Sequence, residues 1–275
     1  MRRLLLVLAG LGLAAAWIGY LGAIRDPVVA RYRVELSGLS RPLRLVHLSD
    51  LHGSAWDMPE VRIVRLMAQV NALQPDLVVI TGDFHSSKLV NPKMWLEESL
   101  RPLMRLRAPL GVWSVPGNHD SPYWTRRVMQ RFGLNLLAGD LVDVGPVQIA
   151  GSDDLVLGQD SVARFRAAAL RARPDKPLIG LVHEPDLWPA TPPNVALLLA
   201  GHTHGGQISL FGLRRLDDFH ERHRRGLFRN PLGQALIVSA GIGTTFVPMR
   251  IGVPPEIVVV ELVPQAPGRK SGTER

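Results

Sequence analysis

From residue 43 onward the chain alternates short apolar runs with amphipathic stretches. The apolar runs have the length of buried strands, and the stretches between them have the spacing of helices that cover a sheet. We expect helices over residues 57–73, 124–132 and 161–172. In the first of these, Asp57 is the expected cap, Pro59 lies in the first turn, and the expected repeating apolar positions are Val61, Val64, Met67 and Val70. The alternation predicts a mixed α/β domain.

Five of the predicted strands share one feature, which is that each ends in residues able to bind a metal or carry a proton. The five segments are "LRLVHLSDLH" (43–52), "PDLVVITGD" (75–83), "PLGVWSVPGNHD" (109–120), "KPLIGLVHEPD" (176–186) and "NVALLLAGHTHGG" (194–206). Further strands are expected within residues 147–154, 234–245 and 255–263. Ligands of α/β sheets bind beyond the carboxyl ends of the strands, so we expect these distant residues to converge on one edge.

The N-terminus has a different pattern, because 21 uncharged, mostly apolar residues run from Leu4 to Ile24. A run of this length crosses a bilayer as one helix, so we expect a transmembrane anchor. The small residues of "LAAAW" keep a cleaved signal peptide as the alternative. Arg2 and Arg3 precede the run and Arg25 follows it, so the positive-inside rule leaves the orientation open.

The expected organisation has four parts. Residues 1–25 are the anchor or an uncleaved signal, residues 26–42 a linker, residues 43–263 the α/β domain and residues 264–275 a disordered tail. The length of 275 residues fits one domain with an appendage.

Composition narrows the possible chemistry. The chain has no cysteine, which excludes a disulfide framework, a thiolate zinc site and a cysteine nucleophile. Its formal net charge of +8 is compatible with a solvated basic surface, an anionic lipid surface, an anionic substrate or nucleic acid. No basic run interleaved with aromatic residues is present, so nucleic acid is the least favoured partner.

The side chains at the five strand ends are imidazoles, carboxylates and one amide. They are Asp50, His52, Asp83, Asn118, His119, Asp120, His183, Glu184, His202 and His204. Mixed nitrogen and oxygen ligands suit Mn²⁺, Fe or Zn²⁺ better than Ca²⁺, which prefers oxygen alone. The set is too large for one tetrahedral site, so we expect two divalent metal ions with a shared carboxylate, and Mn²⁺ is the favoured metal. Such a pair clamps a phosphoryl group during displacement.

The spacing of His202 and His204 is explained if the segment that contains them is extended. Residues two apart point the same way, so both imidazoles are expected to face the site while Thr203 turns away. The flanking glycines let the backbone bend closely around a crowded site. The same argument applies to Asp50 and His52.

The order D-x-H, GD, GNHD, H and GHxH over residues 43–207 resembles the calcineurin-like metallophosphoesterase family. The stretches "GHTHGGQISL" and "VSAGIGTTFVPMRIGVPPEIVVVEL" resemble a narrower branch of membrane-anchored bacterial phosphoesterases that includes a UDP-2,3-diacylglucosamine pyrophosphatase of lipid A synthesis. The resemblance implies a four-layer α/β/β/α sandwich preceded by one transmembrane helix. It also implies a single-pass protein of the bacterial inner membrane, with the side of the catalytic domain left open.

The resemblance further implies a role for each motif residue. Seven side chains are expected to hold the metals: Asp50, His52 and His204 the first, Asp83 both, and Asn118, His183 and His202 the second. His119 is expected to contact the phosphate and protonate the leaving oxygen, which suits the titration range of histidine.

One segment departs from the family pattern. Many relatives read Gly-Asp-x-x-Asp, and the second Asp orients the catalytic histidine, whereas "GDFHSS" has Ser86 there. Asp120 is a candidate substitute partner for His119, and His85 is expected to line the pocket rather than bind metal. Glu184 either orients His183 or is exposed.

The expected function is therefore metal-dependent hydrolysis of a phosphodiester or pyrophosphate bond. A lipid-linked substrate such as UDP-2,3-diacylglucosamine is favoured by the anchor and the basic charge. A soluble or cell-envelope phosphate ester is the alternative within the same chemistry. A non-catalytic metal-binding module and a nuclease are the alternatives outside it.

Overall fold

The computed structural model describes residues 1–86, 94–154, 160–209 and 222–266. Its strands form two six-stranded sheets. The first sheet has the order β1 (Val28–Leu36), β12 (Glu256–Pro264), β2 (Leu43–Leu48), β3 (Leu77–Thr81), β4 (Val112–Val115) and β5 (Asn135–Leu136). The second has the order β10 (Gly226–Arg229), β11 (Ala235–Val238), β9 (Val195–Ala200), β8 (Leu178–Leu181), β7 (Gln148–Gly151) and β6 (Leu141–Asp143).

Most neighbouring strands are parallel, which sends their carboxyl ends to a common edge. In the first sheet β2, β3, β4 and β5 are parallel, and in the second β7, β8, β9 and β11 are parallel. The antiparallel pairs are β12 with β2, β10 with β11 and β6 with β7. Helices and longer loops therefore connect the parallel strands, as crossover connections require.

The two sheets pack face to face with helices outside them, as the hydrophobic clusters demonstrate. A central cluster combines residues of both sheets, for example Leu45 and Val79 of the first with Ile179 and Leu199 of the second. The outer face of the first sheet is covered by α2 (Glu60–Ala72), α3 (Leu96–Leu100), the 3₁₀ turn η1 (Arg101–Arg105) and α4 (Pro122–Phe132). The outer face of the second sheet is covered by α5 (Ser161–Leu170) and the 3₁₀ turn η2 (Pro185–Ala190). The expected α/β/β/α layering is confirmed.

Helix α2 buries two of the four expected apolar positions, Met67 and Val70. Its buried apolar residues are Ile63, Leu66, Met67 and Val70, and Val61 is exposed. A strict spacing of three drifts by about 60° per step on a helix with 3.6 residues per turn, so Val61 and Val70 point in opposite directions. The helix also begins later than expected, with Pro59 as the residue before its first turn and no side-chain cap. The Asp57 carboxylate instead accepts hydrogen bonds from Ser54 and Thr244.

Residues 28–36, within the stretch expected to be a linker, form strand β1. It pairs in parallel with β12 along its whole length, from Val28 with Glu256 to Leu36 with Pro264. The stretch "ARYRVEL" alternates apolar and charged residues, and its apolar side chains pack on the core while the charged ones are exposed, although only Val34 and Leu36 are buried. Of the expected tail, residues 267–275 lie outside the described residues.

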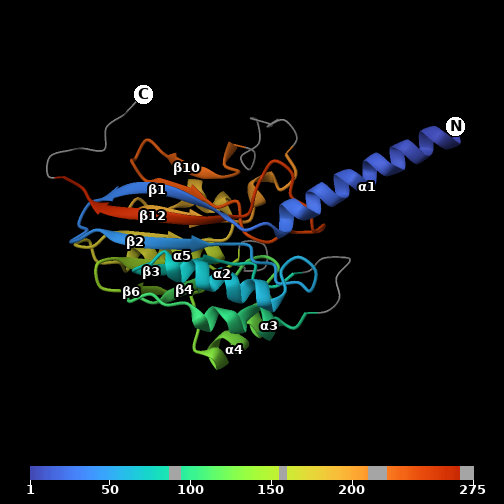
Figure 1. The fold of residues 1–275 in the computed structure, drawn as a ribbon. Coiled ribbons are helices and arrows are strands. Elements are labelled where there is room, and N and C mark those ends of the chain that lie inside the picture. The colour runs from blue at the N-terminus through green and yellow to red at the C-terminus, as the bar shows by residue number, and fades with distance from the viewer. Residues whose placement is uncertain (87–93, 155–159, 210–221, 267–275) are drawn as a thin grey trace.

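The N-terminal helix α1 (Arg2–Ile24) projects from the sandwich (Figure 1). Only Gly19 and Ala23, near its C-terminal end, are buried. Its 23 residues correspond to about 35 Å at 1.5 Å per residue, which matches the hydrocarbon thickness of a bilayer. By length and composition it is the one helix among the described residues that could cross a membrane.

Candidate functional site

The candidate site lies where strands of both sheets end. Asp50 and His52 follow β2, Asp83 follows β3, and Asn118 follows β4. The second sheet contributes His183 after β8, and His202 and His204 after β9. The carboxyl ends of parallel strands bring these residues together across the two sheets, as the sequence predicts.

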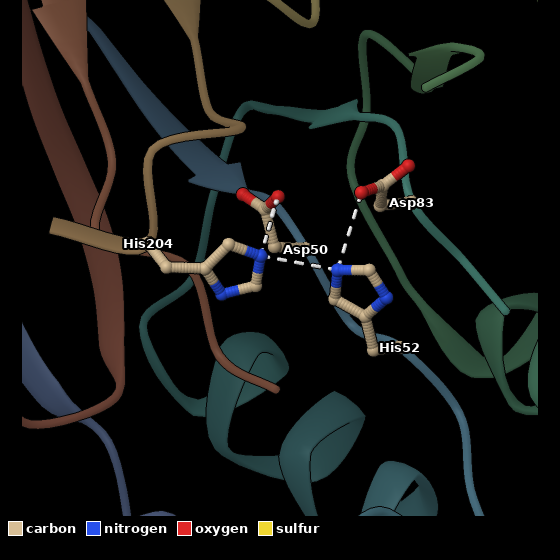
Figure 2. A group of neighbouring side chains, drawn as sticks. All are labelled: Asp50, His52, Asp83 and His204. Atoms are coloured by element: carbon tan, nitrogen blue, oxygen red, sulfur yellow. Dashed lines mark hydrogen bonds and ion pairs between the residues drawn. The ribbon is translucent and has the colours of Figure 1, made fainter. Parts of the chain in front are cut away.

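One cluster contains Asp50, His52, Asp83 and His204 (Figure 2). One ligand atom of each lies within 4.8 Å of those of the others, and all four residues are buried. The Nε2 atom of His204 is 3.1 Å from Nε2 of His52 and 3.4 Å from Oδ1 of Asp50. The Nε2 atom of His52 is 3.1 Å from Oδ2 of Asp83. Two imidazoles and two carboxylates therefore point into one small volume.

A second cluster contains Asn118, His183 and His202. Oδ1 of Asn118 lies 3.0 Å from Nε2 of His183 and 3.0 Å from Nδ1 of His202. Those two nitrogens are 3.3 Å apart. Asp83 joins the clusters, because its Oδ2 atom is 3.1 Å from His52 Nε2 and 3.3 Å from His183 Nε2.

The donor set of the two clusters fits metal ions. Nitrogen atoms of different imidazoles lie only 3.1 Å and 3.3 Å apart, beside carboxylate and amide oxygens. A cation at the centre of such a group satisfies lone pairs that otherwise face one another, and burial makes an unsatisfied polar atom costly. Mixed nitrogen and oxygen ligands without thiolates suit Mn²⁺, Fe and Zn²⁺.

The backbone around the clusters is unusual. Five of the seven residues have left-handed φ angles although none is glycine: Asp50 (53°), His52 (44°), Asp83 (56°), His202 (69°) and His204 (51°). Each such conformation costs on the order of 1 kcal/mol or more, and such residues concentrate at functional sites. The segment around His202 and His204 is therefore not extended, and the explanation expected from alternating side chains is wrong. The two imidazoles reach different clusters by way of left-handed turns.

Two glycines allow close approach to Asp50. A Cβ atom on Gly201 would lie 1.8 Å from Ser49 Oγ and 2.5 Å from Asp50 Oδ2. A Cβ atom on Gly241, which has a φ of 69°, would lie 2.7 Å from the Asp50 Cβ. Side chains at either position would displace the carboxylate, so the glycines of "LAGHTH" and "SAGIG" keep the site compact.

Electrostatic coupling is centred on Asp83. Burial acts to raise the pKa of Asp83, but the imidazoles of His183 and His52 outweigh it and hold this pKa well below its usual value. Burial acts to lower the pKa of His183, but the Asp83 carboxylate raises it well above its usual value. Burial, His52 and Arg250 lower the pKa of His204 well below its usual value. The cluster thus already holds an ion pair whose proton a metal ion can replace.

His119 lies beside this cluster. Its ring packs edge-on against the His52 ring, with the centroids 5.1 Å apart, and its backbone N–H donates to Asp83 Oδ1 at 2.9 Å. Burial lowers the pKa of His119, while Asp83 opposes this shift. A neutral imidazole at this position can donate one N–H and accept one proton.

Asp120, the candidate partner of His119, has another role. Its buried carboxylate accepts hydrogen bonds from the backbone N–H groups of Asp83 (2.8 Å), Phe84 (3.0 Å) and Gly117 (2.9 Å). Burial, reinforced by Asp83, raises the pKa of Asp120 to about 7. Asp120 therefore ties the loop after β3 to the loop after β4.

Three further residues near the site, His85, Ser86 and Glu184, were considered in the sequence. Nδ1 of His85 lies 3.2 Å from Ser99 Oγ, and His85 is outside the four-residue cluster. The backbone N–H of Ser86 donates to the carbonyl of Gly53. Glu184 is buried, so its exposed alternative is wrong, and burial raises its pKa to about 8.

Sequence reasoning missed Arg250. This buried guanidinium donates to the carbonyls of Ala240 (2.8 Å), Gly243 (2.6 Å) and His204 (3.4 Å), and its Nη2 atom lies 3.5 Å from Nδ1 of His204. The signal available in the sequence is a single cation within the apolar stretch from Val247 to Val253. A buried arginine needs several acceptors, and the loop carbonyls around the site provide them.

A two-sheet α/β sandwich with buried carboxylates and imidazoles at its strand ends defines a metal-binding hydrolase site. Residues 43–206 match the calcineurin-like phosphoesterase domain, and the chain belongs to this family. It is a metal-dependent phosphoester hydrolase.

Relatives are found in bacteria and animals. The chain is 32% identical to the uncharacterized metallophosphoesterase YkuE of Bacillus subtilis, over 80% of this chain and 78% of the relative. It is 27% identical to an uncharacterized metallophosphoesterase of Helicobacter pylori, over 90% of this chain and 67% of the relative. It is 30% identical to a "Transmembrane protein with metallophosphoesterase domain" of Bos taurus, over 90% of this chain and 60% of the relative. Among solved structures, the E. coli phosphoesterase Yfce is 15% identical with a TM-score of 0.41, over 74% of this chain and 82% of that chain.

Proposed function

We propose that this protein is a membrane-anchored phosphoesterase with two metal ions, which hydrolyses a phosphodiester or pyrophosphate bond of a lipid-linked substrate. The proposal of two metal ions rests on the position of Asp83 Oδ2, which lies 3.1 Å from His52 Nε2 and 3.3 Å from His183 Nε2. One carboxylate oxygen between two ligand groups is the arrangement that a bridging ligand requires.

In this proposal seven residues divide between the two ions. Asp50, His52 and His204 hold one ion, Asn118, His183 and His202 hold the other, and Asp83 contacts both. Mn²⁺ is the favoured metal, and Fe and Zn²⁺ fit the same donors. When bound, the ions supply positive charge that polarises the phosphoryl group and lowers the pKa of a water molecule.

His119 is the proposed catalytic residue. Its ring stands against His52 at the edge of the cluster, where an imidazole N–H can donate to a phosphoryl oxygen and protonate the leaving oxygen. Burial lowers the pKa of His119, which disfavours the cationic form, but the negative charge of a phosphate group beside the ring acts in the opposite direction. The hydrogen bond from the His119 backbone N–H to the Asp83 carboxylate holds the main chain of His119 beside the cluster.

Helix α1 is the proposed anchor, within the inner membrane of a bacterium. It is long and apolar enough to span a bilayer. Its C-terminal turns also contact the catalytic domain, since the Gly19 carbonyl accepts the Arg250 N–H at 2.8 Å. A cleaved signal peptide has no need of such contacts, so they favour a retained helix. The anchor places an amphipathic substrate such as UDP-2,3-diacylglucosamine within reach of the site.

The test uses the full chain in detergent, stripped of metal and reloaded with Mn²⁺. A chromogenic phosphodiester and UDP-2,3-diacylglucosamine are offered in parallel to the wild type, to His119→Ala and to the matched control His223→Ala. Cleavage of both substrates, lost only in His119→Ala, supports the chemistry and the lipid substrate. Cleavage of the chromogenic ester alone rejects UDP-2,3-diacylglucosamine as the substrate. Cleavage of neither by a metal-loaded chain contradicts the proposed reactions.

A further inference from the structure

The C-terminal end of α1 is packed onto two loops of the catalytic domain. A Cβ atom on Gly22 would lie 2.1 Å from the Arg250 carbonyl oxygen, and one on Gly19 would lie 2.8 Å from the Met249 side chain. The Tyr20 hydroxyl donates to the Trp56 carbonyl at 3.2 Å. Glycines at these helix positions let the backbones approach closely, so α1 is fixed to the loops 54–57 and 244–250.

The loop 244–250 and the residue before it contact the metal cluster. Arg250 donates to the His204 carbonyl, and the Gly243 N–H donates to the Asp50 carbonyl at 2.7 Å. The Thr244 hydroxyl joins the loops by donating to Asp57 at 2.5 Å. The docked end of α1 and the candidate metal site therefore share their supporting segments. Figure 1 shows that α1 leaves the domain on the side toward which β2 points, which is the side where β2 ends before Asp50.

Exposed apolar side chains gather on these segments. We call Trp56 (50% exposed), Ile208 (42%), Phe246 (66%) and Val247 (43%) the apolar rim. Ile208 belongs to it because Gln207 donates to the carbonyls of Thr245 (3.0 Å) and Val247 (3.2 Å), which holds the strand-like segment 207–209 against the loop 244–250. Phe246 has a left-handed φ of 56°, an unfavourable conformation for an aromatic residue.

We propose that the apolar rim enters the headgroup region of the bilayer that holds α1, so that the metal site lies on the membrane-facing side of the domain. This inference rests on the proposed anchoring by α1. A bilayer is the occupant that fits, because the rim is continuous with the docked end of the helix and contains two aromatic residues, which favour membrane interfaces. The exposed Arg25 at the end of α1 adds a cation suited to anionic headgroups.

The orientation has a consequence for the substrate. A phosphate group carried by a lipid is presented at the depth of the headgroups, beside the apolar rim and the clusters that the rim segments support. A substrate with apolar chains thus keeps these chains in the bilayer while its phosphate is cleaved. The inference thereby assigns the site to membrane-embedded phosphoesters rather than to freely diffusing ones.

The absence of cysteine from the chain makes a direct test possible. Phe246→Cys and the matched control Leu232→Cys each receive one environment-sensitive fluorophore in the full-length protein. Leu232 is 69% exposed and precedes β11, so it lies at the end of the second sheet opposite to the site. Both proteins are reconstituted into phosphatidylcholine vesicles that contain phosphatidylglycerol and a lipid with a nitroxide close to its headgroup.

The expected result is quenching of the label at position 246 that exceeds quenching at position 232 at least severalfold. Equal, weak quenching at both positions in vesicles that carry the protein overturns the inference and leaves the anchor intact. Failure of the protein to float with the vesicles overturns the anchor and the inference together. Turnover of a soluble chromogenic diester is measured separately, so a loss of the proposed chemistry is recognised independently of membrane contact. Wild-type turnover by both variants confirms that they fold.

Discussion

His47 and His52 lie on the same short stretch of chain and are equally buried, but their surroundings differ completely. His47 is inside β2, with an ordinary extended backbone, and its Nε2 lies 2.8 Å from the Thr81 hydroxyl. His52 follows the end of the strand, has a left-handed φ, and faces Asp83 and His204. Burial alone lowers the pKa of His47 to about 3. The comparison shows that residue type and burial do not define a site, whereas converging donors and a strained backbone do.

The largest effect is expected at the residue that joins the two clusters. Asp83→Asn preserves the shape of the side chain but removes the negative charge between His52 and His183. We expect phosphodiester turnover to fall by at least about 10³-fold, since a dinuclear site depends on its shared ligand. Steady-state hydrolysis of a chromogenic diester measures this loss. Asp143→Asn, which removes an exposed carboxylate paired with Lys176, is the control and should retain activity.

A smaller loss is expected when the proposed acid is removed and the ligands remain. His119→Ala should lower kcat by about 10²-fold, the usual contribution of a positioned general acid. Metal content by elemental analysis should match that of the wild type, because His119 is outside the cluster of four ligand residues. Normal kcat in this variant would remove His119 from the reaction. A variant that has also lost its metal would make His119 a structural part of the site.

A still smaller effect is expected at Arg250, which contacts His204 but does not belong to the cluster. Arg250→Lys retains the charge but loses the planar set of donors to Ala240, Gly243 and His204. We expect affinity for Mn²⁺, measured by competition with a chelator, to fall about tenfold, as is usual for groups that position ligands. The exposed Arg229→Lys is the control. Unchanged affinity would show that His204 needs no support from Arg250.

The smallest effect is expected at His47, the buried histidine outside the site, and it concerns the free energy of unfolding. The pKa of His47 is about 3 in the native state, and that of an unfolded histidine is about 6.5. Between these pH values the unfolded chain binds a proton that the native chain does not, so the free energy of unfolding falls as pH decreases, by up to about 1.4 kcal/mol per pH unit.

His47→Gln retains a donor for Thr81 but cannot titrate, so its stability should depend less steeply on pH over this range. Denaturant unfolding at several pH values between 6.5 and 4 measures the two slopes. Parallel slopes for wild type and variant would contradict the assignment of this acid sensitivity to His47.

The sequence predicted the α/β layers and the meeting of the strand-end side chains, although not every strand or supporting residue. Apolar runs predicted the sheet strands that carry the ligands, and polar strand ends predicted that Asp50, Asp83, Asn118 and His204 meet. These predictions succeed because parallel strands put their carboxyl ends on one edge, which is a property of the pattern and not of the individual residue.

Other features could not be predicted because they depend on tertiary contacts. The left-handed φ angles of His202 and His204 accompany contacts with distant segments, such as the hydrogen bond from the His202 N–H to the Asp50 carboxylate, which the local sequence does not reveal. Strand β1 is an exception, because the alternation in "ARYRVEL" is a strand signal that the assignment of residues 26–42 to a linker overlooked. Arg250 comes from a loop between β11 and β12 that has no metal-binding pattern, and its role depends on carbonyls that meet only in the folded chain.

The central claim is a site for two metal ions with Asp83 between them. The most direct test is electron paramagnetic resonance, with metal analysis, of the full chain loaded with Mn²⁺. The account predicts two Mn²⁺ per chain with the spectrum of an exchange-coupled pair, and a change to isolated Mn²⁺ or a lower metal content in Asp83→Asn. One Mn²⁺ per wild-type chain, or two without coupling, would contradict it.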